Sequence, residues 1–317
     1  MRQRPLELVL RYDDPVPLSP QVLPDELPPA LHVMPLSDVE LGSEVLGVGS
    51  SGVVLTAQLR DGRTVACKRI RVWESRTRKQ ALAEIRALSA NDCEGIVNLL
   101  GVALEEEGAV LLLLELMDSG SLDRYVSSAS PIPERALAGI AFQALWACSY
   151  LAYLSLSHRD VKPNNILLHS DGKVALADLG LARGGGPTTY VGTLRYMAPE
   201  RCQRSAYGPA ADVWGVGMSL LELVLGFYPY APLLGEDAAS QLAVVLVITE
   251  GGPPPPPPAT SSPALTAFLA AALQWDPSAR ATAATLLEHP FLTGHGCTSL
   301  GAARALVAAW LRTQHPS

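Results

Sequence analysis

The feature that most constrains the fold is a glycine-rich stretch followed directly by a strand pattern. Residues 47–52 read G-V-G-S-S-G, which has the spacing G-x-G-x-x-G. Glycines at this spacing let the backbone approach phosphate oxygens without a Cβ clash, and the turn leaves N–H groups free to bond them. A dinucleotide-binding βαβ unit would need a helix directly after the glycines. Residues 53–55 instead continue as the apolar run V-V-L, so the sequence predicts a phosphate-binding hairpin in a small sheet.

A lysine and a glutamate follow this hairpin at a spacing that suits an ion pair. Lys68 closes the strand-like run V-A-C-K, sixteen residues beyond Gly52. The segment from Thr77 to Ser89 has apolar residues at helical spacing and carries Glu84. An ammonium group that binds inner phosphates needs a carboxylate to hold it, so Glu84 is the predicted partner of Lys68.

Three further motifs follow in a fixed order. Residues 158–165 read H-R-D-V-K-P-N-N and match H-R-D-x-K-x-x-N at every fixed position. Thirteen residues after Asn165 comes D-L-G at 178–180, and A-P-E follows at 198–200. A chance match of this length and order is improbable, so we interpret the motifs as one set.

Together these motifs resemble the eukaryotic protein kinases over roughly residues 39–293. The resemblance implies an α+β, bilobal protein kinase fold with a small β-rich N-lobe and a larger helical C-lobe. We expect an extended N-terminal arm at 1–37, a kinase domain at 38–293 and a C-terminal helical tail at 294–317. Within the domain, the N-lobe is expected at 38–117 and the C-lobe at 118–293.

The resemblance also implies ATP-dependent phosphoryl transfer with Mg²⁺ as the metal cofactor. The expected catalytic residues are Asp160, which would accept the proton of the substrate hydroxyl, then Lys162, Lys68 and Glu84. Asn165 and Asp178 would bind the metal. The expected ATP-binding residues are Leu46, Gly47, Gly49, Ser50, Ser51, Gly52, Val54, Ala66, Lys68, Leu114, Glu115, Met117 and Leu167. Among these, Leu114 would be the gatekeeper, with Glu115 and Met117 in the hinge.

Three other residues are expected to be structural. Glu200 is the predicted partner of Arg280 in a buried ion pair. Asp212, at the start of a predicted buried helix, resembles the carboxylate that anchors the catalytic loop. Leu179 replaces the usual Phe of D-F-G, and because it is apolar it can still pack inward.

Within the kinases, Lys162 and Thr193 follow the Ser/Thr pattern. Residues 115–123 (E-L-M-D-S-G-S-L-D), residues 190–201 (Y-V-G-T-L-R-Y-M-A-P-E-R) and the proline cluster at 253–258 resemble the MAP kinase kinase family. This implies a MAP kinase as substrate, phosphorylated on Thr and Tyr, and an upstream activating kinase. The alternatives are another Ser/Thr kinase, such as one higher in a cascade, and a pseudokinase scaffold. The complete catalytic set argues against the scaffold.

The N-terminal arm contains a candidate docking motif. Arg2 and Arg4 precede Leu6 and Leu8, and in an extended peptide the two leucines point the same way. They could fill a groove while the arginines meet an acidic patch on the partner. The other interpretation is an ordinary tail.

The activation loop departs from the family pattern of two phosphorylatable hydroxyls. Residues 184–186 are glycines at the expected first site, whereas Thr189 matches the second and Thr188 adjoins it. Arg159, beside the catalytic Asp, suits the docking of a phosphate. Thr188 and Thr189 are therefore the candidate regulatory phosphosites, and constitutive or differently triggered activity is the rival hypothesis.

Two segments outside the motifs each leave two interpretations open. The prolines at 253–258 are either an exposed loop between helices or a ligand for a proline-binding domain. The segment from Ser299 to Leu311 ends with apolar residues at i, i+3 and i+4. This pattern indicates either packing on the C-lobe or a docking helix for an upstream kinase.

Composition narrows the setting. Hydrophobic residues make up 48% of the chain, enough for a sizeable core, and the net charge of −7 disfavours nucleic acid as the main partner. The five scattered cysteines form no C-x-x-C pair, which favours reducing cytosol over a disulfide framework or a zinc site. The apolar runs at 110–114 and 242–248 are far shorter than a membrane span. We expect no membrane association and a cytoplasmic protein, with the nucleus as a second compartment.

Overall fold

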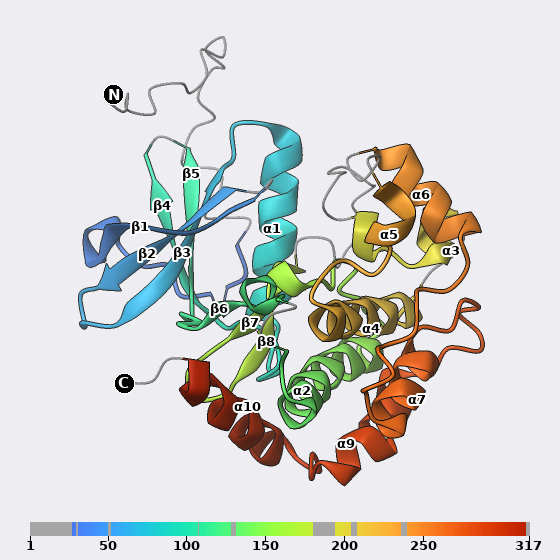
Figure 1. Ribbon diagram of the computed structural model, residues 1–317. Coiled ribbons are helices and arrows are strands. Elements are labelled where there is room, and N and C mark those ends of the chain that lie inside the picture. Colours follow the sequence, from blue (N-terminus) through green and yellow to red (C-terminus); the bar gives the residue numbers. More distant parts are fainter. Residues whose placement is uncertain are drawn as a thin grey trace, which may run out of the picture.

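The computed structural model describes residues 27–29, 31–49, 52–106, 108–127, 131–179, 194–203, 208–235 and 240–314. The chain folds into two lobes, a β-sheet with one long helix and a larger body of helices (Figure 1). This is the predicted bilobal α+β arrangement. The small lobe comes first in the sequence, and its strands pair with one another in a single sheet.

The N-lobe sheet has five antiparallel strands in the order β1-β2-β3-β5-β4. These are β1 (Val39–Gly49), β2 (Gly52–Leu59), β3 (Thr64–Arg71), β4 (Leu99–Glu105) and β5 (Ala109–Leu114). A turn at residues 61–62 joins β2 to β3, and Gly62 has a φ of 86° there. The register sets Lys68 between Val54 on β2 and Leu112 on β5.

Helix α1 (Ser75–Ser89) packs beside the sheet with its apolar face inward. The sequence predicted a helix that begins at Thr77, whereas the helix in the structure begins two residues earlier, at Ser75. Its buried residues include Glu84, a carboxylate on an otherwise apolar face. A charge is retained at such a position only when it is paired, so this residue marks the site.

The apolar runs at 96–102 and 110–117 predict two strands, and one boundary of each prediction was wrong. The strand expected over 96–102 begins only at Leu99, and the strand expected over 110–117 ends at Leu114. Residues 95–97 instead bond the other lobe: Val97 N–H donates to the Leu176 carbonyl and Leu176 N–H donates to the Gly95 carbonyl. Apolar composition cannot distinguish strand residues from an extended inter-lobe connection, because both are buried.

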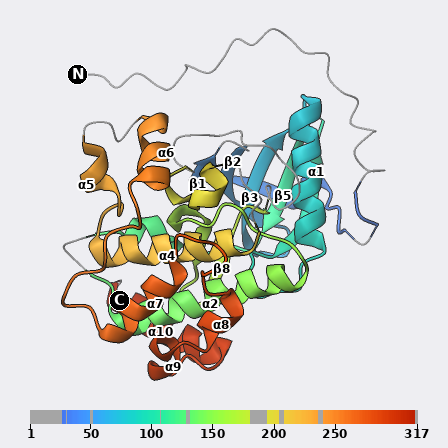
Figure 2. The ribbon, with the colours of Figure 1, turned by 90° about the vertical axis from the view of Figure 1, so that its right-hand side faces the viewer.

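The C-lobe is built around α2 (Glu134–Tyr153) and α4 (Ala210–Leu225), which run side by side through its middle (Figure 2). A small sheet of β6 (Gly120–Ser121), β7 (Ile166–Leu168) and β8 (Val174–Leu176) lies against the N-lobe. Among the described residues, η3 (Leu36–Asp38) precedes β1 in the N-lobe. The other described helices of the C-lobe are η4 (Leu122–Tyr125), η5 (Pro163–Asn165), η7 (Leu194–Tyr196), α3 (Pro199–Cys202), α5 (Ala231–Leu234), α6 (Gln241–Glu250), α7 (Pro263–Ala272), α8 (Ala283–Leu287), α9 (Pro290–Gly294) and α10 (Leu300–Gln314).

Helix α2 is long and apolar enough to cross a membrane by length and composition alone. Within the described residues, 72% of its most apolar stretch is buried inside the protein. A buried core helix passes the same test, and α2 has that position here. The apolar run at 110–114 lies in β5, and the run at 242–248 lies in α6.

Helix α10 packs along α2, in agreement with the first of its two predicted roles. Val307, Trp310 and Leu311 are buried, and the Trp310 ring meets Tyr125 edge-on at a centroid distance of 4.9 Å. A Cβ on Gly139 of α2 would lie 2.7 Å from the Ala303 carbonyl oxygen, so the absence of a side chain lets the two helices approach closely.

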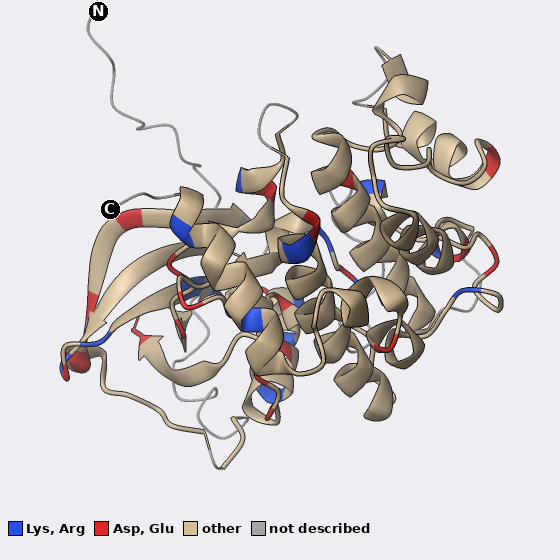
Figure 3. Cartoon of the chain, turned by 60° about the horizontal axis from the view of Figure 1, so that its bottom comes forward, with Lys and Arg blue, Asp and Glu red and all other residues tan. Residues whose placement is uncertain are grey.

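The end of the predicted arm runs beside β4. Met34 N–H donates to the Val102 carbonyl at 2.8 Å, and Val102 N–H donates to the His32 carbonyl at 3.0 Å. The described prolines at 253–258 lie in the connection between α6 and α7 and form neither helix nor strand. Figure 3 shows Lys and Arg interspersed with Asp and Glu over both lobes, without an extended basic face on the coloured part of the chain in that view.

Candidate active site

One lysine joins three elements at the boundary between the lobes. Lys68 of β3 extends its ammonium to 2.6 Å from Glu84 Oε1 on α1 and to 3.2 Å from Asp178 Oδ1, just after β8. The side chains of Lys68 and Glu84 are 7% and 4% exposed, whereas Asp178 is 40% exposed. Burial disfavours the ammonium, but the charges of Glu84 and Asp178 outweigh it and raise the pKa of Lys68. The lysine therefore stays charged over the accessible pH range.

Asp178 is held in a backbone conformation that is uncommon for its residue type. Its φ is 67°, in the left-handed region. Burial would raise its pKa, but the Lys68 charge and hydrogen bond lower it overall, so the carboxylate is ionised. The next side chain, Leu179, is 3% exposed, and the leucine packs inward as predicted.

The catalytic-loop motif forms a compact set of bonds around Asp160. Its Oδ2 accepts from Lys162 Nζ at 2.7 Å and from Asn165 Nδ2 at 2.8 Å. The Asn165 amide nitrogen also donates to the Asp160 backbone carbonyl at 2.8 Å. Lys162 and Asn165 therefore meet at the Asp160 carboxylate, on a loop that ends in η5.

A buried aspartate on α4 anchors the start of this loop. Asp212 accepts from the backbone N–H groups of His158 and Arg159, both at 2.7 Å, and is 2% exposed. The His158 ring uses Nδ1 to accept from the Asp160 N–H at 3.3 Å, so its Nε2 donates to the Ala177 carbonyl at 2.9 Å. This is the anchoring expected from the sequence.

The predicted ion pair between Glu200 and Arg280 is present and buried. Two guanidinium nitrogens of Arg280 lie 2.8 and 3.1 Å from the two carboxylate oxygens of Glu200. The same guanidinium donates to the Ala210 carbonyl at 2.9 Å and lies over the Trp214 ring. The Arg280 guanidinium thus bonds groups at the start of α3 and at the start of α4, and it holds the two together.

The glycine-rich hairpin has the predicted backbone form. Gly49 pairs with Gly52 at the tip of β1 and β2, and Gly47 pairs with Val54. Gly52 has a φ of 144°, and a Cβ there would lie 2.2 Å from the Arg69 carbonyl oxygen, so only glycine fits. Ser50 and Ser51, also predicted to bind ATP, lie outside the described residues.

A family model of the protein kinase domain matches residues 42–292. The chain is 35% identical over 295 residues to mitogen-activated protein kinase kinase 2 of Arabidopsis thaliana, covering 90% of this chain and 80% of the relative. It belongs to the MAP kinase kinase family of protein kinases. Mitogen-activated protein kinase kinase SIPKK of Nicotiana tabacum is 33% identical over 85% of this chain and 78% of its own length. Mitogen-activated protein kinase kinase 3 of Arabidopsis thaliana is 36% identical over 79% of this chain and 49% of its own length.

The apolar residues that are expected to contact adenine lie at the boundary between the two lobes of this kinase. Ala66 on β3 pairs with Leu114 at the end of β5, next to the buried Met117. Leu167 packs against the same cluster from the C-lobe. Leu46, Val54, Leu114 and Leu167 are half-buried. Partial burial on both sides of the boundary between the lobes suits residues that line a cleft.

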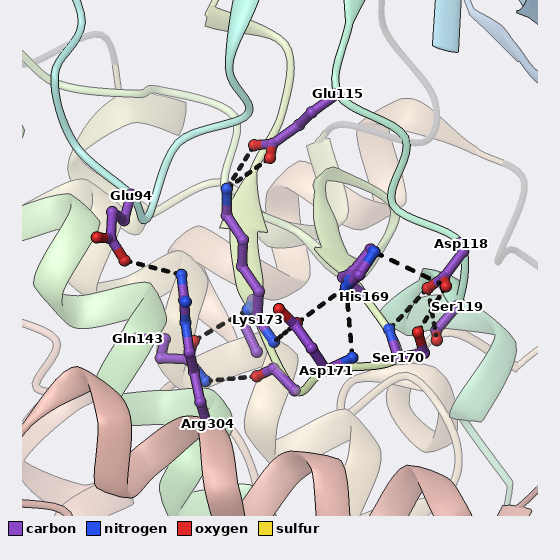
Figure 4. A network of polar contacts seen from close by, with 12 residues as sticks. Glu94, Glu115, Asp118, Ser119, Gln143, His169, Ser170, Asp171, Lys173 and Arg304 are labelled. Carbon is purple, nitrogen blue, oxygen red and sulfur yellow. Dashed lines mark hydrogen bonds and ion pairs between the residues drawn. The ribbon is translucent and has the colours of Figure 1, made fainter. Parts of the chain in front are cut away.

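The side chain of Glu115, in the expected hinge, is bound by residues that are not among the predicted ATP-binding residues. Its carboxylate accepts from Lys173 Nζ at 2.6 and 2.7 Å (Figure 4). It also accepts from Asn98 N–H at 2.8 Å. Its backbone N–H donates to the Asn98 carbonyl at 3.0 Å, which leaves the backbone carbonyl for a nucleotide. Lys173 was not among the predicted residues, because it lies 58 positions away and belongs to no motif.

Two other partnerships were missed by the sequence. The Arg201 guanidinium donates to the Arg159 backbone carbonyl, and Tyr196 O–H donates to Glu222 at 2.6 Å. In the sequence, the one indication that Arg201 has a role was its position directly after the A-P-E motif. The predicted residues Thr188, Thr189, Thr193, Arg2, Arg4, Leu6 and Leu8 lie outside the residues that the structure describes.

Proposed function

We propose that this protein kinase phosphorylates Thr and Tyr in the activation loop of a MAP kinase, and that an upstream kinase activates it in turn. One observation carries the catalytic part: Asp160, bonded by Lys162 and Asn165, lies beside the Lys68, Glu84 and Asp178 set. The link is the Asn165 carbonyl, which accepts at 2.8 Å from the N–H of Ala177, the residue before Asp178. The names of the relatives support the choice of substrate. One of them, from Drosophila melanogaster, is called a dual specificity mitogen-activated protein kinase kinase.

The arrangement supports a specific division of labour. Asp160 accepts the proton of the substrate hydroxyl as its oxygen forms a bond to the γ-phosphorus of ATP. The bond from that phosphorus to the bridging oxygen breaks, and ADP leaves. Lys162, 2.7 Å from Asp160, offsets negative charge on the transferred group, while Lys68 binds the inner phosphates.

The residues present fit Mg²⁺. Asn165 donates its amide nitrogen to Asp160, which turns its amide oxygen away from that carboxylate, and Asp178 uses Oδ1 for Lys68. Each residue thus offers one hard oxygen, the ligand type that Mg²⁺ takes in small number beside phosphate oxygens. The described residues hold no group of three or more His, Cys, Asp or Glu for a metal, consistent with an ion held largely by the nucleotide. When bound, the ion neutralises phosphate charge.

The N-terminal arm is the proposed docking element for the MAP kinase. Arg2 and Arg4 would meet an acidic patch while Leu6 and Leu8 fill an apolar groove. We further propose Thr188 and Thr189 as the activating phosphosites, with Arg159 as a ligand of the phosphate. A Thr188→Ala/Thr189→Ala variant should then fail to respond to an upstream kinase, and full activation of that variant would refute the assignment.

The test is transfer from Mg-ATP to a panel of kinase-dead MAP kinases. The intact chain is compared with an Asp160→Ala variant and with a chain lacking residues 1–10. The proposal expects phosphate on both Thr and Tyr of one partner, weakened by the deletion and abolished by Asp160→Ala. Transfer to generic Ser/Thr peptides but to no MAP kinase would retain the kinase activity and reject the substrate.

We also propose a cytoplasmic location with the nucleus as a second compartment. All five cysteines are free thiols and four of them are buried, which suits a reducing environment. Imaging of the tagged chain in cells of its source would test this, and accumulation in a secretory compartment would contradict it.

A further inference from the structure

The residue before Asp160 has a backbone conformation that contacts with other residues must stabilise. Arg159 has a φ of 70°, in the left-handed region that residues with a Cβ seldom occupy. Such a conformation persists only when the surrounding structure fixes it. Its N–H is fixed by Asp212, as described above. Its carbonyl belongs to the following peptide, which leads into Asp160.

That peptide is held at both ends. Its carbonyl accepts from the Arg201 guanidinium, and its N–H, which belongs to Asp160, donates to the His158 ring at 3.3 Å. Because a peptide group is planar, fixing its oxygen and its hydrogen fixes the position of the Asp160 Cα, while Lys162 and Asn165 hold the carboxylate. Arg201 is the contributor to this arrangement that comes from outside the catalytic loop.

Arg201 is itself set on a rigid support. It follows Glu200 in the short helix α3, and Glu200 is locked to Arg280 in the buried, two-point ion pair. Arg201 is half-buried, so part of its side chain is removed from competing water. A charged donor to a carbonyl in such a place makes a strong hydrogen bond.

We propose that Arg201 is a positioning residue for phosphoryl transfer, which aligns Asp160 by holding the peptide between Arg159 and Asp160. It links the end of the activation segment to the catalytic loop and does not touch the reacting atoms. The inference depends on kinase activity alone and not on which protein is the substrate. A generic basic protein therefore serves as the phosphate acceptor, and the test is independent of the MAP kinase assignment.

The experiment measures kcat and KM for the full chain with Arg201→Met, Arg201→Lys and the exposed control Arg135→Met. Arg201→Met is expected to lower kcat by roughly tenfold to a hundredfold, the cost of a misplaced catalytic group, with KM for ATP within about twofold. Arg201→Lys keeps a cationic donor and should recover most of the rate. Arg135→Met should match the unaltered kinase. An unchanged kcat in Arg201→Met would overturn the proposal.

A second measurement separates positioning from general support of the fold. Arg201→Met is combined with Asp160→Asn and the residual rate is measured. If Arg201 acts through Asp160, the added change should cost less than about twofold, because the group that it positions is already disabled. An equal loss in both backgrounds would refute positioning. If Arg201→Met does not fold, Arg201→Gln, which is shorter and uncharged but still polar, enters the same cycle with the same two outcomes.

Discussion

The Lys68 ammonium lies 2.6 Å from the Glu84 carboxylate, and both side chains are almost fully removed from water. Lys68 comes from the central strand of the N-lobe sheet and Glu84 from the helix beside it. Their contact therefore reports how α1 is seated on the sheet. Asp178 of the C-lobe also contacts Lys68. The position of the ammonium group therefore depends on β3, on α1 and on the segment after β8.

Loss of the Lys68 charge should disable phosphate transfer. We expect Lys68→Met to lower kcat by about 10²–10³, the usual loss on removing one positioned donor. Glu84→Gln should cost less, since Asp178 still pairs with Lys68. Steady-state kinetics with a protein substrate measure both. Lys79→Met, an exposed lysine on α1, is the control and should behave as the unaltered kinase.

Metal dependence should follow Asn165 and Asp178. Chelation of divalent ions with EDTA is expected to abolish transfer, and added Mg²⁺ to restore it. Asp178→Asn and Asn165→Ala should each shift the rate curve to higher free Mg²⁺, because each removes an oxygen ligand or its charge. Asp171→Asn, in the turn before β8, is the control. Curves that coincide for all variants would remove these residues from the metal site.

The pair between Glu200 and Arg280 should dominate the stability of the C-lobe near the activation segment. Arg280→Met leaves a buried carboxylate without its partner, which typically costs about 3–5 kcal/mol. The midpoint of thermal unfolding should fall by roughly 10 °C. The comparison is Arg60→Met, whose partner Asp38 lies 3.5 Å away on the surface, where such a pair adds little. Equal shifts for both variants would contradict the assignment.

Gly172 should be intolerant of a side chain. Its φ is 90°, and a Cβ there would lie 2.1 Å from the Arg304 carbonyl oxygen of α10. Gly62 has a similar φ of 86° but no atom within 4 Å of the same position. Gly62→Ala should thus cost only the backbone strain, roughly 1–2 kcal/mol, while Gly172→Ala should cost more. Denaturant unfolding measures the loss of stability in each variant. Equal losses would show that α10 moves aside at no cost in free energy.

The thiols should resist alkylation in the folded kinase. Burial, followed by the charge of Glu105, raises the pKa of Cys67 to about 12. Burial likewise raises the pKa of the half-buried Cys202 and of Cys297 to about 11. Since the thiolate is the reactive form, iodoacetamide at pH 8 should modify these residues slowly. Mass spectrometry before and after denaturation tests this. Rapid native labelling of Cys67 would be inconsistent with the packing of β3.

The sequence alone determined the parts of the site that depend on local geometry. The glycines at 47–52 predicted the hairpin because positive φ and close backbone approach leave few other residues possible. The H-R-D-V-K-P-N-N string predicted which residues form the catalytic loop, and in the structure Lys162 and Asn165 both bond Asp160. The Lys68 partner was also predicted, because the order of motifs fixed which helix supplies it.

The tertiary structure decided what depends on residues brought together from distant parts of the chain. The bonds from Lys173 to Glu115 and from Arg201 to Arg159 join residues 58 and 42 positions apart. The tertiary structure likewise decided that β5 ends at Leu114 and that α10 packs on α2. A pattern of apolar and polar residues sets which face of an element is buried. It does not set which element covers that face, and these contacts arise only when the two lobes and the terminal helix have packed.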